Sequence, residues 1–218
     1  MNSVAQAQDG GIPKAILLAR MGSRPGAHNQ AGSITTTTKT TITTKTVKAS
    51  LPTIRRYDPD WRSAVLALQN MHLRIPLDGF DPARMKGSFY QGRGTGMHQA
   101  TDMLSPRNTP IHAVSDGLIA KLFTSRFGGT TIYQFDPTNK YVFYYAHLQR
   151  YADGLADGRS VKRGAIIGYV GTSGNAPPNT PHLHFSIGIL GKDQRWWEAR
   201  SIDPYEVFVG SPIQPIAM

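Results

Sequence analysis

Residues 181–190 read PHLHFSIGIL, and this stretch combines a clear strand pattern with the most distinctive side chains of the chain. Successive side chains of a β-strand point to opposite faces, so His182 and His184 share one face. Leu183 and Phe185 then point to the other face, where we expect them to join the core. The pattern predicts a strand over residues 182–190 that holds two imidazoles side by side.

Similar β-rich runs, separated by turn residues, fill the chain from residue 111 onward. Asp136-Pro137-Thr138-Asn139 predicts a hairpin turn between two of them. Before them, Asp58 as N-cap and Pro59 at the first helical position predict one helix over residues 59–72. The sequence therefore favours a mainly β, antiparallel fold with a peripheral N-terminal helix. The expected strands lie over residues 111–123, 129–136, 140–148, 164–170 and 182–190.

Length and composition exclude several classes of protein. The chain has 218 residues, enough for one domain of ordinary size with a tail or for two very small domains. It contains no apolar run of the length that a transmembrane helix needs, so we expect no transmembrane segment. It also contains no cysteine. A disulfide framework, a thiolate zinc site and a cysteine nucleophile are therefore ruled out.

Much of the basic charge lies in the first quarter of the chain. Residues 1–56 hold eight of the 24 Lys and Arg side chains but one of the 14 acidic ones. Residues 1–50 are rich in Gly, Ser, Gln and Thr, and their Thr/Lys run lacks apolar periodicity, so we expect a disordered leader. A basic arm favours contact with an anionic wall polymer or membrane surface. Nucleic acid is not an expected partner, because residues 57–218 are near neutral and lack a basic stripe with interleaved aromatics.

Two histidine patterns point to metal chemistry. His98 and Asp102 lie four positions apart in a Gly-rich stretch, and His182 and His184 form the pair on the strand. Catalytic zinc takes three protein ligands and keeps a position for water, so His98, Asp102 and one histidine of the pair would suffice. The remaining histidine of the pair is then a candidate general base, and His147 a candidate for binding the oxyanion. The other three histidines lack such neighbours and are expected to be structural or solvated: His28, His72 and His112.

A series of short motifs identifies a family. They are His98-Gln99-Ala100-Thr101-Asp102, Thr109-Pro110-Ile111-His112-Ala113, Asp116-Gly117, Tyr145-Ala146-His147-Leu148, Val161-Lys162-Arg163-Gly164, Ile167-Gly168-Tyr169-Val170-Gly171-Thr172-Ser173-Gly174, Pro181-His182-Leu183-His184-Phe185 and Ile202-Asp203-Pro204. In this order they make residues 89–208 resemble the lysostaphin/LytM-type zinc metallopeptidase domain. Members of that family cut peptide bonds in bacterial peptidoglycan.

The resemblance implies a role for each matching residue. His98, Asp102 and His184 correspond to the zinc ligands, His182 to the general base and His147 to the histidine that helps to bind the oxyanion. It also implies a two-layer antiparallel β fold with the site in a groove bounded by loops. Many members have Gly where this chain has Ala100, which is tolerated if the backbone there does not need a positive φ.

The loops beside the site are expected to set the choice of substrate. Residues 175–181 contain three prolines and should form a rigid wall. Tyr144, Tyr145 and Tyr169 are candidates to line the groove, although alternation sends one of the adjacent tyrosines to the core. The expected organisation is a leader over residues 1–50, a helix and connecting segment over 51–88, and the zinc metallopeptidase domain over 89–210.

The function that the resemblance implies is zinc-dependent hydrolysis of peptide stems or cross-links of peptidoglycan, which places the protein in the periplasm or cell wall. No export peptide is recognised in the sequence. The alternative is a non-hydrolytic wall-binding or regulatory module of the same type, with an occluded zinc groove. In that alternative an upstream side chain would supply a fourth ligand. The candidates for it are Asn70, His72, Asp78 and Asp81.

Overall fold

A computed structural model describes residues 59–94 and 96–210. Helix α2 (Pro59–Asn70) precedes two 3-10 helices, η1 (Pro82–Met85) and η2 (Ser88–Tyr90), and α3 (Pro204–Phe208) follows the last strand. The strands are β1 (Gly92–Arg93), β2 (Gly96–Met97), β3 (Thr101–Leu104), β4 (Pro110–His112), β5 (Gly117–Ser125), β6 (Gly129–Phe135), β7 (Tyr141–Tyr151), β8 (Ser160–Val161), β9 (Ile166–Val170), β10 (His182–Leu190) and β11 (Ala199–Ile202).

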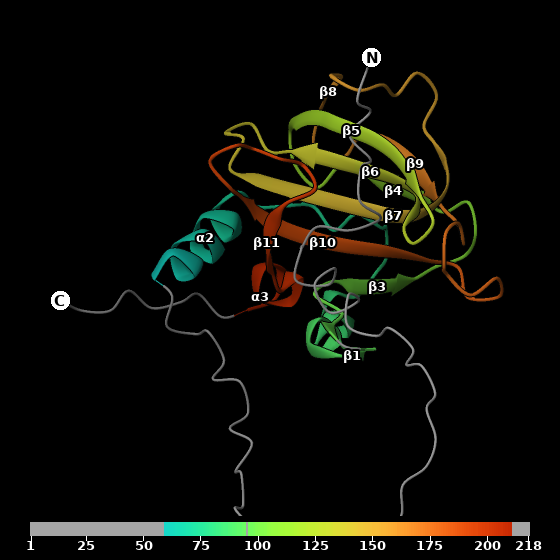
Figure 1. The fold of residues 1–218 in the computed structure, drawn as a ribbon, viewed down its shortest axis with the longest axis horizontal. Coiled ribbons are helices and arrows are strands. Elements are labelled where there is room, and N and C mark those ends of the chain that lie inside the picture. Colours follow the sequence, from blue (N-terminus) through green and yellow to red (C-terminus); the bar gives the residue numbers. More distant parts are fainter. Residues whose placement is uncertain (1–58, 95, 211–218) are drawn as a thin grey trace, which may run out of the picture.

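Hydrogen bonds join nine of these strands into one antiparallel sheet, in the order β11-β10-β7-β6-β5-β8 (Figure 1). Strand β3 pairs with β10, and β9 pairs with both β7 and β4. Strands β1 and β2 form a separate two-stranded ribbon that leads into the first histidine motif. The long strands β7 and β10 lie side by side at the centre and carry five of the histidines and tyrosines considered above.

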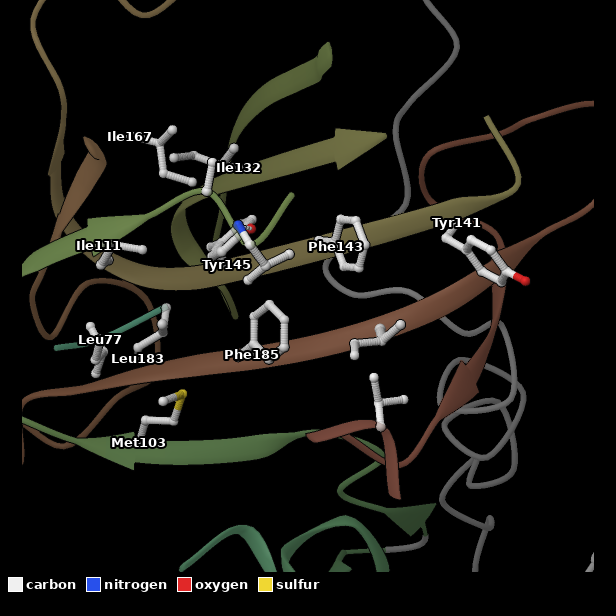
Figure 2. Packing of buried hydrophobic residues seen from close by; sticks show 14 of the residues in the cluster. Leu77, Met103, Ile111, Ile132, Tyr141, Phe143, Tyr145, Ile167, Leu183 and Phe185 are labelled. Carbon is white, nitrogen blue, oxygen red and sulfur yellow. Dashed lines mark hydrogen bonds between the residues drawn. The ribbon is translucent and has the colours of Figure 1, made fainter. Parts of the chain in front are cut away.

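The alternating pattern of β7 and β10 builds the core on one face of the sheet. Figure 2 shows Phe143 and Tyr145 of β7 beside Phe185 of β10. The rings of Tyr145 and Phe185 lie 5.3 Å apart, and both side chains are fully buried. Helices α2 and α3 and strands β4 and β9 cover this face with apolar side chains. Burying one large apolar side chain stabilises a fold by about 1.5–3 kcal/mol, so this face anchors the sheet and leaves the opposite face for the site.

The predicted mainly β, antiparallel fold with a peripheral helix is confirmed. The turn after β6 is confirmed as well, since the Asp136 carboxylate accepts hydrogen bonds from the backbone N–H groups of Thr138, Lys140 and Tyr141 at 2.7–2.9 Å. This side chain replaces the backbone partners that a reversing chain loses. The helix begins at Pro59 as predicted and ends at Asn70, two residues early.

The single strand predicted over residues 111–123 is wrong, because the chain forms two strands with different partners. Strand β4 pairs with β9, whereas β5 pairs with β6 and β8. Between them, the Val114 N–H donates to the Tyr145 hydroxyl at 3.2 Å, and the Ser115 carbonyl accepts from Gln134 Nε2 at 2.8 Å. Between β4 and β5, buried side chains thus supply the hydrogen bonds that pairing with a neighbouring strand would otherwise give the backbone.

The expected leader over residues 1–50 and the N-cap at Asp58 lie outside the described residues. Within residues 59–94 and 96–210, no helix has both the length and the apolar character needed to span a bilayer.

Candidate metal centre

Three side chains from separate segments meet on the face of the sheet opposite the core. His98 follows β2, Asp102 lies on β3 and His184 lies on β10. Strand pairing sets Asp102 directly opposite His184, so their side chains share a face. The His98 N–H donates a hydrogen bond to the Gln91 carbonyl at 2.8 Å, and this bond holds the loop that carries His98.

The three donor atoms form a nearly equilateral triangle. His98 Nε2 lies 3.1 Å from Asp102 Oδ1 and 3.1 Å from His184 Nδ1, and the third side is 3.0 Å. A tetrahedral ion with bonds of about 2.0–2.2 Å would hold such ligand atoms about 3.3–3.6 Å apart. Two imidazole nitrogens and one carboxylate oxygen at this spacing fit three ligands of a catalytic metal site that keeps a fourth position open.

Hydrogen bonding fixes which nitrogen of His98 faces the cluster. Its Nδ1 lies 3.1 Å from the carbonyl oxygen of Ser88, which can only accept, so Nδ1 carries the proton. The Nε2 atom therefore presents a lone pair to Asp102 and His184. Converging acceptors at this distance repel one another unless a cation lies between them. The arrangement is that of a cation site, oriented by a backbone carbonyl from η2.

The charge states of the cluster also suit a metal. Burial raises the pKa of Asp102, but the adjacent imidazoles of His184 and His98 more than offset this and hold that pKa well below its ordinary value. Burial lowers the pKa of His184, although the neighbouring Asp102 opposes this. Asp102 is therefore ionised and His184 neutral near pH 7, the states in which each binds a metal.

His147 and His182 lie beside the cluster, and Nδ1 of each ring faces a backbone carbonyl. Their rings are 4.9 Å apart, and the His147 ring is 5.7 Å from that of His184. The Nδ1 atom of His147 lies 2.8 Å from the Ser173 carbonyl, and that of His182 lies 2.8 Å from the Thr180 carbonyl. Each ring therefore carries its proton on Nδ1 and has an unprotonated Nε2.

A β-bulge turns His147 toward the site. Ala146 and His147 of β7 together oppose one residue of β6, Thr131, and His147 has a φ of 62°. Simple alternation would send His147 to the core with Tyr145, because Ala146 lies opposite His184. A left-handed residue in a bulge re-aims its side chain, and such conformations cluster at functional sites. Burial, reinforced by His184, lowers the pKa of His147 to about 4, so the ring is neutral at pH 7.

The groove tyrosines separate as alternation requires. Tyr145 lies in the core, where its hydroxyl donates a hydrogen bond to Gln134 Oε1 at 2.7 Å. Tyr144 lies on the side of the site, with its ring 6.0 Å from that of His184. Tyr169 lies under Arg150, whose guanidinium carbon is 3.9 Å from the ring centroid. Ala100 is buried and does not have a positive φ; its neighbour Gln99 does, at 55°, so Ala replaces Gly there without backbone strain.

The remaining candidates stand apart from the cluster. The Asp78 carboxylate pairs with Arg74 and lies 3.2 Å from His112 Nε2, while Asp81 caps η1 by accepting from the Ala83 N–H at 2.9 Å. His72 is exposed just after α2. Among residues 59–94 and 96–210, no further His, Asp or Glu joins His98, Asp102 and His184. His28 lies outside the described residues.

Sequence reasoning missed Ser88, Arg93 and Arg107. The Ser88 carbonyl orients His98, and Arg93 Nη2 lies 2.6 Å from Asp102 Oδ2. Arg107 contacts the loop before β10, as described below. Arg93 precedes the His98 motif by a few residues in a Gly-rich stretch, but nothing in that spacing indicates a contact with Asp102.

Comparison with known proteins places this geometry in a family. Residues 96–197 match the model of peptidase family M23. This part of the chain is similar to M23 domains of the LytM type. The chain is 35% identical over 117 residues to the L-Ala–D-Glu endopeptidase of Bacillus subtilis, covering 51% of this chain and 34% of that protein. It is 33% identical over 141 residues to the peptidoglycan DD-endopeptidase ShyC of Vibrio cholerae, covering 62% and 30%.

Solved structures include similar chains. The catalytic domain of the antimicrobial peptidase lysostaphin from Staphylococcus simulans superposes with a TM-score of 0.46 at 26% identity, covering 66% of this chain and 96% of that one. For Csd3 of Helicobacter pylori the TM-score is 0.48 at 28% identity, covering 62% and 32%. The chain spans about a third of the length of the two curated relatives named above.

Proposed function

We propose that this protein is a zinc-dependent endopeptidase that hydrolyses peptide bonds in the stems or cross-links of bacterial peptidoglycan. The observation that carries the proposal is the triangle of His98, Asp102 and His184 donor atoms with two further histidines beside it. The relatives named above are endopeptidases, and one is named for peptidoglycan. Zinc bound by the three residues would polarise the scissile carbonyl and lower the pKa of a bound water to about 7.

His182 is proposed as the general base. Its Nδ1–H is held by the Thr180 carbonyl, so its unprotonated Nε2 is free to take the proton of the attacking water. That Nε2 lies 3.8 Å from Asp102 Oδ1, at the edge of the cluster.

His147 is proposed to stabilise negative charge on the scissile carbonyl oxygen. Burial lowers its pKa to about 4, which makes it a weak base. The same low pKa makes its protonated form a strong hydrogen-bond donor. The Ser173 carbonyl holds Nδ1–H, so His147 donates to the oxygen from Nε2 only as an imidazolium, after Nε2 has taken up a proton released by the attacking water.

The substrate implies the setting. Peptidoglycan lies outside the cytoplasmic membrane, so we propose that the protein acts in the periplasm or cell wall. The basic residues of the segment 1–56 would add attraction to anionic wall polymers or to a membrane surface.

Digestion of purified sacculi by the full chain tests the proposal. We expect new amino termini on cross-linked peptides, lost with a zinc chelator and restored by zinc. Mass analysis of the released peptides identifies the bond. His184→Ala serves as the inactive control, and heated protein controls for release without enzyme. About one bound zinc per chain without any release would overturn the proposal and favour the non-hydrolytic regulatory alternative.

A further inference from the structure

One loop orients both histidines that lie beside the candidate metal centre. Residues 171–181 join β9 to β10, and the Ser173 carbonyl in this loop accepts from His147 Nδ1. The Thr180 carbonyl, at the other end of the same loop, accepts from His182 Nδ1. Both distances are 2.8 Å. The position of this loop therefore sets the direction of two imidazole Nε2 atoms that come from different strands.

The first half of the loop is packed firmly against β6. A Cβ atom on Gly174 would lie 2.3 Å from the Gly129 nitrogen, so the two backbones touch. The Thr130 N–H donates to Ser173 Oγ at 2.9 Å, and the Asn175 N–H donates to the Phe127 carbonyl at 2.9 Å. These contacts fix the carbonyl that orients His147.

The second half of the loop has few such contacts. Residues 176–181 include three prolines, which have no N–H to donate. The Thr180 N–H bonds within the loop, to the Pro177 carbonyl at 3.0 Å. Besides the contact of His182 with Thr180, two hydrogen bonds tie residues 176–181 to described parts of the chain outside the loop. The Ser105 N–H donates to the Pro181 carbonyl at 3.3 Å, and Arg107 Nη2 lies 3.3 Å from the Pro178 carbonyl.

Arg107 ties this half of the loop to the rest of the site. Its Nη2 also donates to Thr172 Oγ1 at 2.9 Å, and its Nη1 donates to Gln149 Oε1 on β7 at 2.7 Å. One planar guanidinium thus bridges both halves of the loop and the strand that carries His147. Its own backbone is held nearby, since the Asn108 N–H donates to the Val170 carbonyl at 2.8 Å.

We propose that Arg107 is a positioning residue for His182 and His147. It acts through the loop 171–181 and contacts none of the three candidate metal ligands in the described structure. The proposal rests on the proposed function for its kinetic consequence, because the two histidines must face the substrate for their orientation to matter. A displacement of about 1 Å in such a group lowers the rate about 100-fold.

Kinetics of Arg107→Ala and Arg107→Lys in the full zinc-loaded chain test the proposal. We expect Arg107→Ala to lower kcat about 10–100-fold with KM, zinc content and Tm close to wild type. Arg107→Lys should recover part of the lost kcat, since a lysine ammonium reaches fewer of the three acceptors than the forked guanidinium of arginine does. Arg159→Ala is the matched control. Arg159 also donates a hydrogen bond to the carbonyl of a loop residue, Gly154, but that loop contributes no residue to the site.

NMR of the imidazole Nδ1–H protons gives a readout that does not depend on turnover. Wild type and Arg159→Ala should both show slowly exchanging signals from His147 and His182, and Arg107→Ala should weaken the His182 signal most. An unchanged His182 signal together with unchanged kcat would overturn the proposal, as would a fall in Tm or zinc content that matches the loss of activity. If wild type itself fails to cleave peptidoglycan, the proposed function fails while the NMR comparison still decides the role of Arg107.

Discussion

Arg93 Nη2 lies 2.6 Å from Asp102 Oδ2, while the other oxygen of the same carboxylate faces His98 and His184. The arginine comes from the β1–β2 ribbon, in the same segment as His98, and its side chain is half exposed. Each oxygen of Asp102 therefore has its own partner. The guanidinium fixes the rotation of the carboxylate so that Oδ1 points into the triangle.

The first prediction concerns this contact. Arg93→Met removes the hydrogen bond to Oδ2, and we expect zinc affinity to fall about 10–100-fold, as is usual when a partner of a metal ligand is lost. Arg93→Gln keeps a donor without the charge and should retain most of the affinity. Competition with a chromogenic chelator measures both. A rise in affinity for Arg93→Met would mean that repulsion between the guanidinium and the metal outweighs orientation.

The second prediction separates ligands from the general base. Asp102→Ala and His184→Ala should lose bound zinc and activity together, because each removes one donor of the triangle. His182→Ala should keep about one zinc per chain and lose turnover. Added zinc should raise the Tm of wild type and His182→Ala, since a ligand that binds the folded state stabilises it. Retained activity in Asp102→Ala would break the assignment.

The third prediction uses the left-handed backbone of His147, whose φ is 62°. A residue with a Cβ atom is destabilised by about 1–2 kcal/mol in this conformation, whereas glycine is not. His147→Gly should therefore unfold at higher denaturant than His147→Ala, by about 1 kcal/mol, with both variants inactive and both able to bind zinc. The same pair of substitutions at Arg150, an exposed β7 position without a positive φ, should show the opposite order. Equal stability of the two His147 variants would contradict the role of backbone strain.

The fourth prediction concerns Asp203, the N-cap of α3, whose carboxylate accepts from the Tyr205 N–H at 2.9 Å. Burial raises the pKa of Asp203 from 3.8 to about 6. Between these values the folded state keeps a proton that the unfolded state has released, so stability falls as pH rises through this window. Above about pH 6 the full cost is present, at most about 3 kcal/mol.

Asp203→Asn keeps the capping oxygen and removes the charge. The variant should be more stable than wild type at about pH 7.5, and the difference should vanish near about pH 3.5. Urea unfolding at the two pH values measures it. Asp153→Asn, at a fully exposed side chain, is the control. A difference that does not depend on pH would show that the charge of Asp203 is not its source.

The candidate ligands were accessible from sequence because each lies in a short motif with a local geometric meaning. Period-two alternation places His182 and His184 on one face of β10, and the structure agrees. Local spacing also predicts the start of α2 and the turn at Asp136. It does not say which histidine of the pair faces Asp102, because that depends on the pairing of β3 with β10.

The sequence by itself determined the fold class and the core face of β10, since alternation and turn chemistry act over a few residues. Its motifs also indicated the three candidate ligands and the two histidines beside them. The tertiary structure decided the rest. The bulge that turns His147 out of the core arises from mismatched pairing between β6 and β7. The contacts of Arg93 with Asp102 and of Arg107 with the loop 171–181 join residues on different segments. Such long-range partners exist only once the sheet has assembled, because nothing in the local sequence fixes the distance between them.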